Sequence, residues 1–217
     1  MDWILMRKVE ISNRSTFFDQ TNRFHQHMIT LRPASTTDAT FIAEGIYAAF
    51  LIPEHSPHKQ EWLKILTNVC EQPDTHYSYT NTIIAEYDGC NAGMIIAVDG
   101  RHYRQQRNNM YPQLKNIFDL VFGLDWEKME DEAQSGEFYI DSLSVSPNYQ
   151  GKGIGSQLIR HAIQRAQQLS IPRVTLAVEP NNPAKRLYTN LGFHFDHPIV
   201  IFNDTYHLYS LEIPIVD

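Results

Sequence analysis

A short glycine-rich turn is the part of the chain whose residue types and spacing are best suited to binding a ligand. Gly151, Gly153 and Gly155 lie between an apolar, strand-like run at residues 138–145 and a helical run at residues 156–169. Because glycine has no Cβ, the backbone amides of such a turn can approach a ligand closely, and the following helix places about half a positive charge at its N-terminus. Free amides and a positive helix end together bind phosphate. The sequence therefore predicts a pyrophosphate site at this turn.

Other nucleotide-binding turns also place glycine between a strand and a helix. A dinucleotide fold requires Gly-x-Gly-x-x-Gly, but counting from Gly151 and Gly153 puts Ser156 at the third glycine position. A Walker loop would need Gly-Lys-Ser/Thr, which is missing. Residues 174–179 still resemble a ribose-binding strand because they end in Glu179, so a nucleotide-dependent oxidoreductase stays open. A purely structural role, in which the glycines allow close packing of helix and strand, stays open too.

Two motifs in the expected order resemble those of the Gcn5-related N-acetyltransferases (GNAT). Residues 141–155 resemble motif A, Gln/Arg-x-x-Gly-x-Gly/Ala, with Gln150, Gly153 and Gly155 at its defined places. Further along, Asn181-x-x-Ala184-x-x-Leu187-Tyr188-x-x-x-Gly192-Phe193 resembles motif B. The resemblance implies an α/β fold in which a mixed, mainly antiparallel sheet is flanked by helices. It also implies that strands four and five are parallel and splayed apart, and that acetyl-coenzyme A is the cosubstrate.

The resemblance further implies which residues bind the coenzyme. The backbone of strand four near its end, where the family has a bulge, binds the pantetheine arm and the thioester carbonyl. Asn181 would donate a hydrogen bond to the pantetheine arm, and Ala184 would leave space for the coenzyme. The full implied set is Leu143, Ser144, Val145, Gln150, Gly151, Lys152, Gly153, Ile154, Gly155, Ser156, Asn181 and Ala184.

The chemistry requires a group that removes a proton from the acceptor. An amine with a pKa of about 10.4 is almost entirely protonated at neutral pH, so a carboxylate or an ordered water near strand four should accept its proton. Simple alternation puts Phe138 and Ile140 on one face of this strand. It puts the candidate bases Glu137 and Asp141 on the other face, with Tyr139, Leu143 and Val145, unless a bulge intervenes. The alternative is that both carboxylates are structural.

Tyr188 matches the general acid of the family. A departing thiolate resembles a thiol with a pKa of about 8.5, so a tyrosine with a pKa of about 10 can protonate it at modest cost. The alternative is a buried structural tyrosine. Cys70 and Cys90 lie outside both motifs, so we expect direct attack in a ternary complex and no acyl-enzyme.

The remaining elements follow from hydrophobic periodicity and caps. We expect a first strand from Met28, a helix capped at Thr37 or Asp38, and a second helix at residues 58–70. Residues 82–89 and 92–98 predict a hairpin, and residues 174–178 a strand. In the helix after the glycines, Ile154, Leu158, Ala162, Ala166 and Leu169 form an inner stripe, which leaves Arg160, Gln164, Arg165 and Gln168 for solvent.

The domain organisation has two irregular parts. Residues 1–27 form a polar N-terminal extension to the N-acetyltransferase domain at residues 28–217. Residues 101–136 form an insertion between strands three and four, with a helical pattern at residues 111–122. This insertion should lie over the acceptor side, where Tyr103, Tyr111, Phe118 and Trp126 are candidates to line the pocket. The favoured alternative is that Leu114, Ile117, Phe118 and Val121 only pack the helix on the domain.

Composition limits the partners. The 217 residues carry 18 basic and 25 acidic side chains, a formal charge of −7, which is the wrong sign for nucleic acid but suits a cationic amine. No apolar stretch is long enough for a membrane span, and neither cysteine lies in a metal-binding motif, so we expect a cytoplasmic protein without a metal. A homodimer through the edge of the last strands is possible.

Three functions stay open. The first is an N-acetyltransferase that moves acetyl from acetyl-coenzyme A to a primary amine, of a small molecule in the first place and of a peptide in the second. The next is a catalytically silent acyl-coenzyme A binding or sensor module. The third is the nucleotide-dependent oxidoreductase.

Overall fold

The structure is a computed structural model that describes residues 27–49, 56–122, 131–201 and 204–214, without the side chains of residues 117–122. The predicted N-terminal extension therefore lies outside the described residues, apart from His27. So do Trp126 and the side chains of Ile117, Phe118 and Val121. No helix in the described ranges is both long and apolar enough to cross a membrane.

A seven-stranded sheet forms the centre of the molecule, in the order β1-β2-β3-β4-β5-β7-β6. Neighbouring strands are antiparallel except β4 and β5, which are parallel and joined by a helical crossover. The strands are β1 Ile29–Pro33, β2 Thr82–Tyr87, β3 Cys90–Asp99, β4 Glu137–Val145, β5 Arg173–Val178, β6 His194–Ile201 and β7 Asp204–Glu212. The mixed, mainly antiparallel sheet is thus confirmed, and it rules out the all-parallel sheet of a dinucleotide fold.

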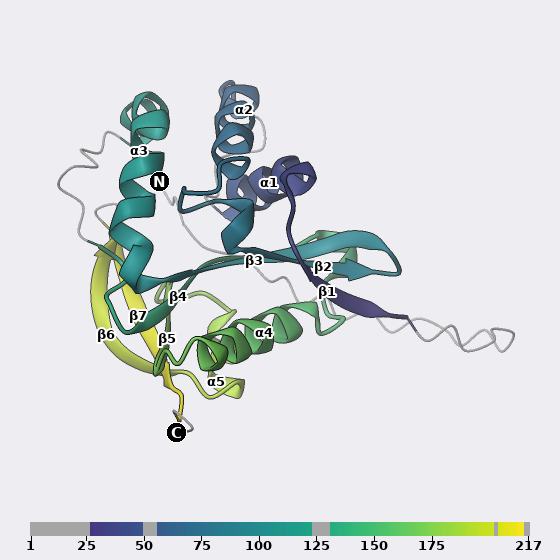
Figure 1. Ribbon diagram of the computed structural model, residues 1–217, viewed down its shortest axis with the longest axis vertical. Helices are drawn as coiled ribbons and strands as arrows, with labels where there is room; N and C mark the ends of the chain where they lie inside the picture. Colours follow the sequence, from purple (N-terminus) through teal and green to yellow (C-terminus); the bar gives the residue numbers. More distant parts are fainter. Residues whose placement is uncertain (1–26, 50–55, 123–130, 202–203, 215–217) are drawn as a thin grey trace, which may run out of the picture.

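Helices cover both faces of the sheet. They are α1 Ala39–Ala49, α2 Lys59–Cys70, α3 Gly100–Phe122, α4 Ile154–Gln168 and α5 Lys185–Asn190, with short 3-10 turns at η1 Thr36–Asp38, η2 Tyr79–Asn81 and η4 Pro147–Tyr149. Figure 1 shows α1, α2 and α3 on one face of the sheet and α4 and α5 on the other. Each layer therefore buries its own hydrophobic cluster against the sheet.

The inner stripe predicted for α4 is confirmed. Four of its residues are at most 2 % exposed, and Leu169 is half-buried against the same cluster; the four are Ile154, Leu158, Ala162 and Ala166. The hairpin is also confirmed, because Asp88 and Gly89 both have positive φ and join β2 to β3 directly.

The cap before α1 differs from the prediction. Ser35 is the N-cap residue of the turn that leads into the helix, and it forms a capping box with Asp38. Asp38 is 5 % exposed, and its two carboxylate oxygens each accept a hydrogen bond from Arg32 at 2.8 Å. These bonds hold the pKa of Asp38 well below its usual range. Asp38 is therefore hydrogen-bonded to Arg32 and Ser35. Ser35 caps the 3-10 turn η1, and α1 begins after this turn, at Ala39.

Helix α3 begins earlier than predicted, at Gly100 rather than at residue 111. Its first turn is capped by Asp99, whose Oδ1 accepts a hydrogen bond from the Arg101 amide at 2.9 Å. The early part of the helix is polar, so its inner face carries no hydrophobic period. That face is made instead by Tyr103 and Arg107, which are both buried.

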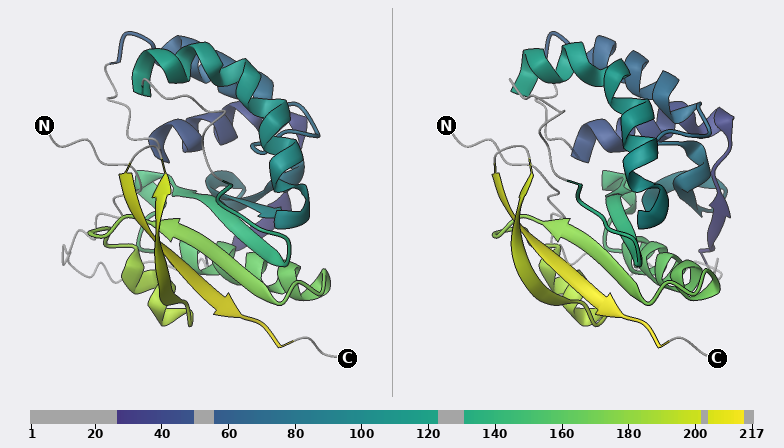
Figure 2. Two further views of the ribbon diagram at one scale, coloured as in Figure 1. Left: turned by 90° about the vertical axis from the view of Figure 1, so that its left-hand side faces the viewer. Right: turned by 60° about the vertical axis from the view of Figure 1, so that its left-hand side comes forward.

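The edge of the sheet at β6 carries exposed apolar side chains. Figure 2 shows α3 running beside α2, and the β6–β7 hairpin at the sheet edge farthest from β1. β6 is an edge strand, with Phe195 46 % and Val200 66 % exposed. The homodimer predicted through this edge stays a prediction.

Candidate active site

The glycine-rich turn leads from β4 into α4 along a backbone path that needs glycine. Gly151 and Gly153 have φ values of +75° and +82°, which side chains with a Cβ rarely adopt. A Cβ added at either position would meet no atom within 4 Å, so the space in front of the turn is open. Gly153 is the N-cap residue of α4.

The first turn of α4 presents backbone amides to this space. The first intrahelical bond runs from the Gln157 amide to the Gly153 carbonyl at 3.1 Å, and the amides of residues 154–156 precede it. The Gln150 side chain donates to the Val145 carbonyl at 3.2 Å and ties the turn to the end of β4. The result is a fixed group of donors at the positive end of a helix.

A cleft of about 700 Å³ opens beside the turn, with α1 on one side and α4 and α5 on the other. Ten of the twelve residues predicted to bind coenzyme line it: Leu143, Ser144, Val145, Gln150, Gly151, Gly153, Ile154, Gly155, Ser156 and Ala184. The other two lie elsewhere. The Lys152 ammonium is 4.8 Å from the centre of the Tyr87 ring, and Asn181 is exposed away from the lining.

The cleft coincides with a gap between β4 and β5. These strands pair only from Glu137 with Arg173 to Ile140 with Leu176. β4 then continues to Val145 while paired with β3, and β5 continues to Val178 while paired with β7. Beyond Ile140, one edge of β4 therefore faces the cleft rather than β5. This is the splay that the resemblance implied for strands four and five.

A bulge in β4 lies at the start of the gap. Opposite β3, Ile96 pairs with Ser142 and Ala97 pairs with Ile140, which leaves Asp141 without a counterpart. The bulge changes which side chains share a face. Leu143 and Val145 pack in the cluster beneath α4 with Ile140, whereas Tyr139 packs on the opposite side of the sheet. Simple alternation, which put Leu143 and Val145 on the face of Asp141, is wrong beyond the bulge because the extra residue shifts the register by one.

Asp141 is held from two sides. Its Oδ1 lies 3.0 Å from His76 Nε2, and its Oδ2 accepts a hydrogen bond from the Ser142 hydroxyl at 2.6 Å. The side chains of His76 and Asp141 are 3 % and 13 % exposed. His76 comes from the segment before η2, and its carbonyl accepts a hydrogen bond from the Asn81 side chain at 3.0 Å. The bulge therefore presents a carboxylate that is both buried and oriented.

Glu137, the other predicted base, lies at the opposite end of β4. It lies four positions before Asp141, roughly 13 Å along a strand. Its Oε2 accepts a hydrogen bond from the Gln134 amide at 3.0 Å, and its Oε1 lies 3.8 Å from Arg173 Nε. Glu137 is thus at the paired end of the two strands, where its contacts are those of a structural group.

A second carboxylate lies near Asp141. Glu132 is half-buried and accepts a hydrogen bond from the Tyr139 hydroxyl at 2.5 Å. Burial, and then the charge of Asp141, raise the pKa of Glu132 to about 7. In the part of the chain that the structure describes, no group of three or more His, Cys, Asp and Glu is arranged to hold a metal ion.

Sequence reasoning missed both His76 and Glu132. Each lies in an irregular segment where no period or cap predicts where the side chain points. Only their residue types, an imidazole and a carboxylate, could have marked them as candidates, and the chain holds 10 histidines and 25 acidic residues. The sheet topology brings the two segments together at the bulge.

Tyrosines surround this cluster. The ring centres of His76 and Tyr103 are 4.9 Å apart, and those of Tyr103 and Tyr139 are 5.9 Å apart. Tyr103 and Tyr111, predicted to line the acceptor pocket, are 2 % and 4 % exposed. Burial raises the pKa of both phenols, and the charge of Glu132 adds to the effect. Leu114 is fully buried, as the alternative packing role for this helix predicted.

Tyr188 lies on the other side of the gap. It comes from α5, lines the cleft, and is only 1 % exposed. Its ring packs edge to face on Phe193, with ring centres 6.3 Å apart. The helix that carries it starts from a turn in which Asn182 Oδ1 accepts a hydrogen bond from the Ala184 amide at 2.8 Å. Tyr188 thus lines the cleft itself, whereas Asp141 is not among the lining residues and lies at the bulge where the pairing of β4 with β5 ends.

Parts of the chain are similar in sequence to known acetyltransferases. The mycothiol acetyltransferase of Actinosynnema mirum is 33% identical over 102 residues, which are 46% of this chain and 28% of that protein. The spermine/spermidine N(1)-acetyltransferase of Bacillus subtilis is 35% identical over 78 residues, 35% of this chain and 51% of that protein. The chain therefore matches about half or less of the length of these curated relatives.

Solved structures share the fold. An N-acetyltransferase from Staphylococcus aureus Mu50 superposes with a TM-score of 0.69 at 22% identity, over 84% of this chain and all of that one. The PaiA N-acetyltransferase of Thermoplasma acidophilum, solved with coenzyme A, superposes with a TM-score of 0.52 at 16% identity, over 86% of this chain and 99% of that one. The sequence model of the acetyltransferase (GNAT) family matches residues 43–193, which include the glycine-rich turn, the bulge and the helix of Tyr188. The chain belongs to the acetyltransferase (GNAT) family.

Proposed function

We propose that the protein transfers acetyl from acetyl-coenzyme A to a primary amine of a small molecule, by direct attack in a ternary complex. The observation that carries this proposal is the gap between β4 and β5, which opens directly onto the amides at the start of α4. A long, thin ligand with a diphosphate at one end fits a gap that ends in a phosphate-binding helix terminus. The family membership of residues 43–193 supports the same reaction.

The residues present fit the coenzyme. The amides of residues 154–156 and the open space before Gly151 and Gly153 form a cradle for the diphosphate. The edge of β4 beyond Ile140 offers backbone groups to the amide-containing arm. The coenzyme supplies the activated acetyl group as a thioester. Donors from the β4 backbone near Val145 would stabilise negative charge that develops on the carbonyl oxygen.

Asp141 is our candidate for the proton acceptor. A carboxylate at a strand bulge projects from a fixed backbone, and here it lies at the point where the gap begins. It takes one proton from the ammonium of the acceptor, which leaves the amine lone pair available for attack. General-base catalysis of this kind typically contributes a factor of about 10² to 10⁴.

His76 positions Asp141. An ionised carboxylate can only accept hydrogen bonds, so the 3.0 Å contact assigns the proton of a neutral imidazole to Nε2. Nδ1 is then an acceptor, and it is buried with no hydrogen-bond partner among the described residues. Together with the Ser142 hydroxyl, His76 gives each oxygen of Asp141 a donor. We infer that this arrangement fixes the orientation of the carboxylate.

Tyr188 is our candidate for the group that protonates the departing thiolate. It lies across the cleft from the bulge, on the helix of motif B, so the proton donor and the proton acceptor approach the thioester from different sides. The phenol gives up its proton to the thiolate as the carbon–sulfur bond breaks, and the resulting phenolate takes up the second proton that the attacking nitrogen loses as the amide forms. No residue forms a covalent bond to the acetyl group in this scheme.

The acceptor is proposed to be a cationic small molecule. Asp141 and Glu132 are close enough for the charge of one to raise the pKa of the other, so this region attracts a cation. The names of the relatives, a mycothiol acetyltransferase and a spermine/spermidine acetyltransferase, support a small acceptor rather than a protein.

The test is to incubate the protein with acetyl-coenzyme A and a panel of polyamines, aminoglycosides, amino acids and peptides, and to follow the release of free thiol. We expect turnover with at least one small amine and weaker turnover with peptides. The Asp141→Asn variant serves as the control for slow hydrolysis. Tight binding of acetyl-coenzyme A without turnover on any amine would refute the transferase proposal in favour of a sensor module. Failure to bind the coenzyme would refute both.

A further inference from the structure

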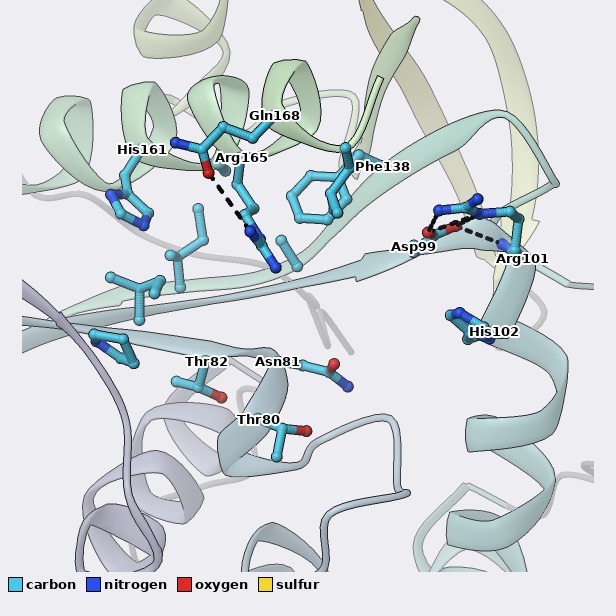
Figure 3. A pocket seen from close by; sticks show the side chains of 16 residues that line it. Thr80, Asn81, Thr82, Asp99, Arg101, His102, Phe138, His161, Arg165 and Gln168 are labelled. Atoms are coloured by element: carbon cyan, nitrogen blue, oxygen red, sulfur yellow. Dashed lines mark hydrogen bonds and ion pairs between the residues drawn. The ribbon is translucent and has the colours of Figure 1, made fainter. Parts of the chain in front are cut away.

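A second cavity lies under the opposite end of α4 from the glycine-rich turn. Its volume is about 590 Å³, and it is bounded by the last turns of α4, by the sheet, and by the segments that precede β2 and follow β3. None of its lining residues belongs to the coenzyme cleft. Figure 3 shows it open between α4 and the strands, with Thr80, Asn81 and Thr82 on the side away from α4. Nothing in the proposed reaction uses it.

An arginine points into this cavity. Figure 3 shows Arg165 extending from α4 toward the sheet, with its guanidinium inside the cavity. The Arg165 side chain is exposed and donates a weak hydrogen bond to Gln168 Oε1 at 3.5 Å. No carboxylate of the described residues lies within ion-pair distance of Arg165, whereas Arg32, Arg101 and Arg173 are each paired with one. Arg165 and Gln168 are exposed, as predicted, and both also line this open cavity.

The charged groups that line the cavity differ in whether they are paired. His161 precedes Arg165 by one helical turn and is half-buried in the wall. Burial lowers the pKa of His161, and the charge of Arg165 lowers it further. On the far side, the charge of Arg101 is neutralised by Asp99 through a short bidentate contact. The unmatched charge in the cavity is therefore the guanidinium of Arg165, in a chain whose formal net charge is −7.

The remaining lining of the cavity combines polar side chains with an apolar part. Ile83, Ile95 and Phe138 form part of the floor, and Leu169 part of the roof. Thr80 and Thr82 already donate their hydroxyl hydrogens to backbone carbonyls. The cavity thus offers one strong cationic donor beside an apolar surface, which suits a ligand with a charged end and an apolar body.

We propose that this cavity binds a small organic carboxylate, with the carboxylate on Arg165 and the apolar body against the floor formed by β2, β3 and β4. The site is separate from the coenzyme cleft, so the proposal stands whether or not the proposed acetyl transfer is correct. The bound carboxylate would lie beside Ala97, which pairs with Ile140 next to the β4 bulge. It would also lie beside Asn81, whose side-chain amide donates a hydrogen bond to the His76 carbonyl.

The test uses benzoate as the probe and His161 as the reporter. The pKa of His161 is measured by NMR from its ring proton shifts with and without benzoate, because a bound carboxylate favours the imidazolium form. We expect saturable binding and a rise in the pKa of His161. Arg165→Gln should weaken benzoate binding at least about tenfold, and Arg160→Gln, an exposed arginine on the same helix, should leave it unchanged.

Three controls make the proposal refutable. Benzyl alcohol has the same ring without the charge, and binding equal to that of benzoate would show only an apolar hollow. Inorganic phosphate that binds as well as benzoate would refute the organic ligand in favour of a simple anion site. An unchanged pKa of His161 at saturating benzoate, or unchanged affinity in Arg165→Gln, would refute the site altogether. Titration with acetyl-coenzyme A checks that each variant is folded and that its first cleft is intact.

Discussion

Replacing Gly153 by alanine separates the role of the glycine-rich turn in ligand binding from its role in the fold. Gly153 has φ +82°, and an added Cβ meets no protein atom within 4 Å. The substitution therefore costs only the backbone energy of placing a Cβ residue in the left-handed region, about 1–2 kcal/mol. Gly89 in the β2–β3 turn has φ +81° and is equally open. Gly89→Ala should therefore destabilise the protein by a similar amount.

The two variants should differ in coenzyme binding. If the space before Gly153 holds the diphosphate, the methyl group introduced by Gly153→Ala displaces an oxygen from one charge-assisted hydrogen bond, worth about 1.5–3 kcal/mol. Isothermal titration calorimetry should then show the Kd of acetyl-coenzyme A raised by roughly 10- to 150-fold in Gly153→Ala and unchanged in Gly89→Ala. Thermal unfolding should show similar losses of stability in both. Equal affinities in the two variants would mean that the diphosphate lies elsewhere.

Three further predictions concern the acetyl-transfer chemistry and the buried cluster. Asp141→Asn should lower kcat/KM by about 10² to 10⁴ and His76→Gln by about tenfold, with partial recovery as pH rises toward the pKa of the amine; a His76→Gln loss that is the same at every pH would show a purely structural role. Tyr188→Phe should lower kcat at pH 6–8 and matter less above about pH 8.5, where a thiolate leaves unaided; unchanged turnover from pH 6 to 9 would exclude it as the acid. Glu132→Gln tests stability: because the pKa of Glu132 is raised from 4.5 to about 7, the folded state binds the extra proton between these values, so the unfolding free energy falls as pH rises through this window. Denaturant unfolding at pH 5 and pH 8 should show wild type losing on the order of 2 kcal/mol relative to the variant, and parallel pH profiles would contradict the shift.

The coenzyme side of the molecule could be predicted from the sequence because it is built from backbone. Positive φ requires glycine, a helix start leaves free amides, and a parallel strand pair requires a crossover helix. These constraints are local, so the turn at Gly151 and Gly153 and the buried stripe of α4 can be read directly. The gap between β4 and β5 could be inferred only through the family resemblance, because no residue type marks where two strands part.

The acceptor side could not be predicted in the same way, because it is built from side chains that meet across the fold. Nothing local indicates that His76 contacts Asp141, which is 65 positions away. The bulge at Asp141 also defeats simple alternation, because one extra residue reverses the faces of everything beyond it. The start of helix α3 was predicted too late for a related reason. The buried face of its first half includes Arg107, and a search for hydrophobic periodicity leaves an arginine out.

The charge partners around the bulge are consistent with the role proposed for Asp141 in binding and deprotonating a cationic acceptor. The carboxylate oxygens of Asp131 lie 2.6 Å from Arg104 Nε and 2.8 Å from a terminal nitrogen of Arg107. Two arginines are therefore paired with the residue that precedes Glu132. Glu132 instead accepts a hydrogen bond from Tyr139, and its pKa rises because Asp141 is near. Keeping Glu132 ionised beside Asp141 therefore costs the folded state stability at neutral pH. The same pair lowers the energy of a bound ammonium, and it lies where the gap between β4 and β5 begins.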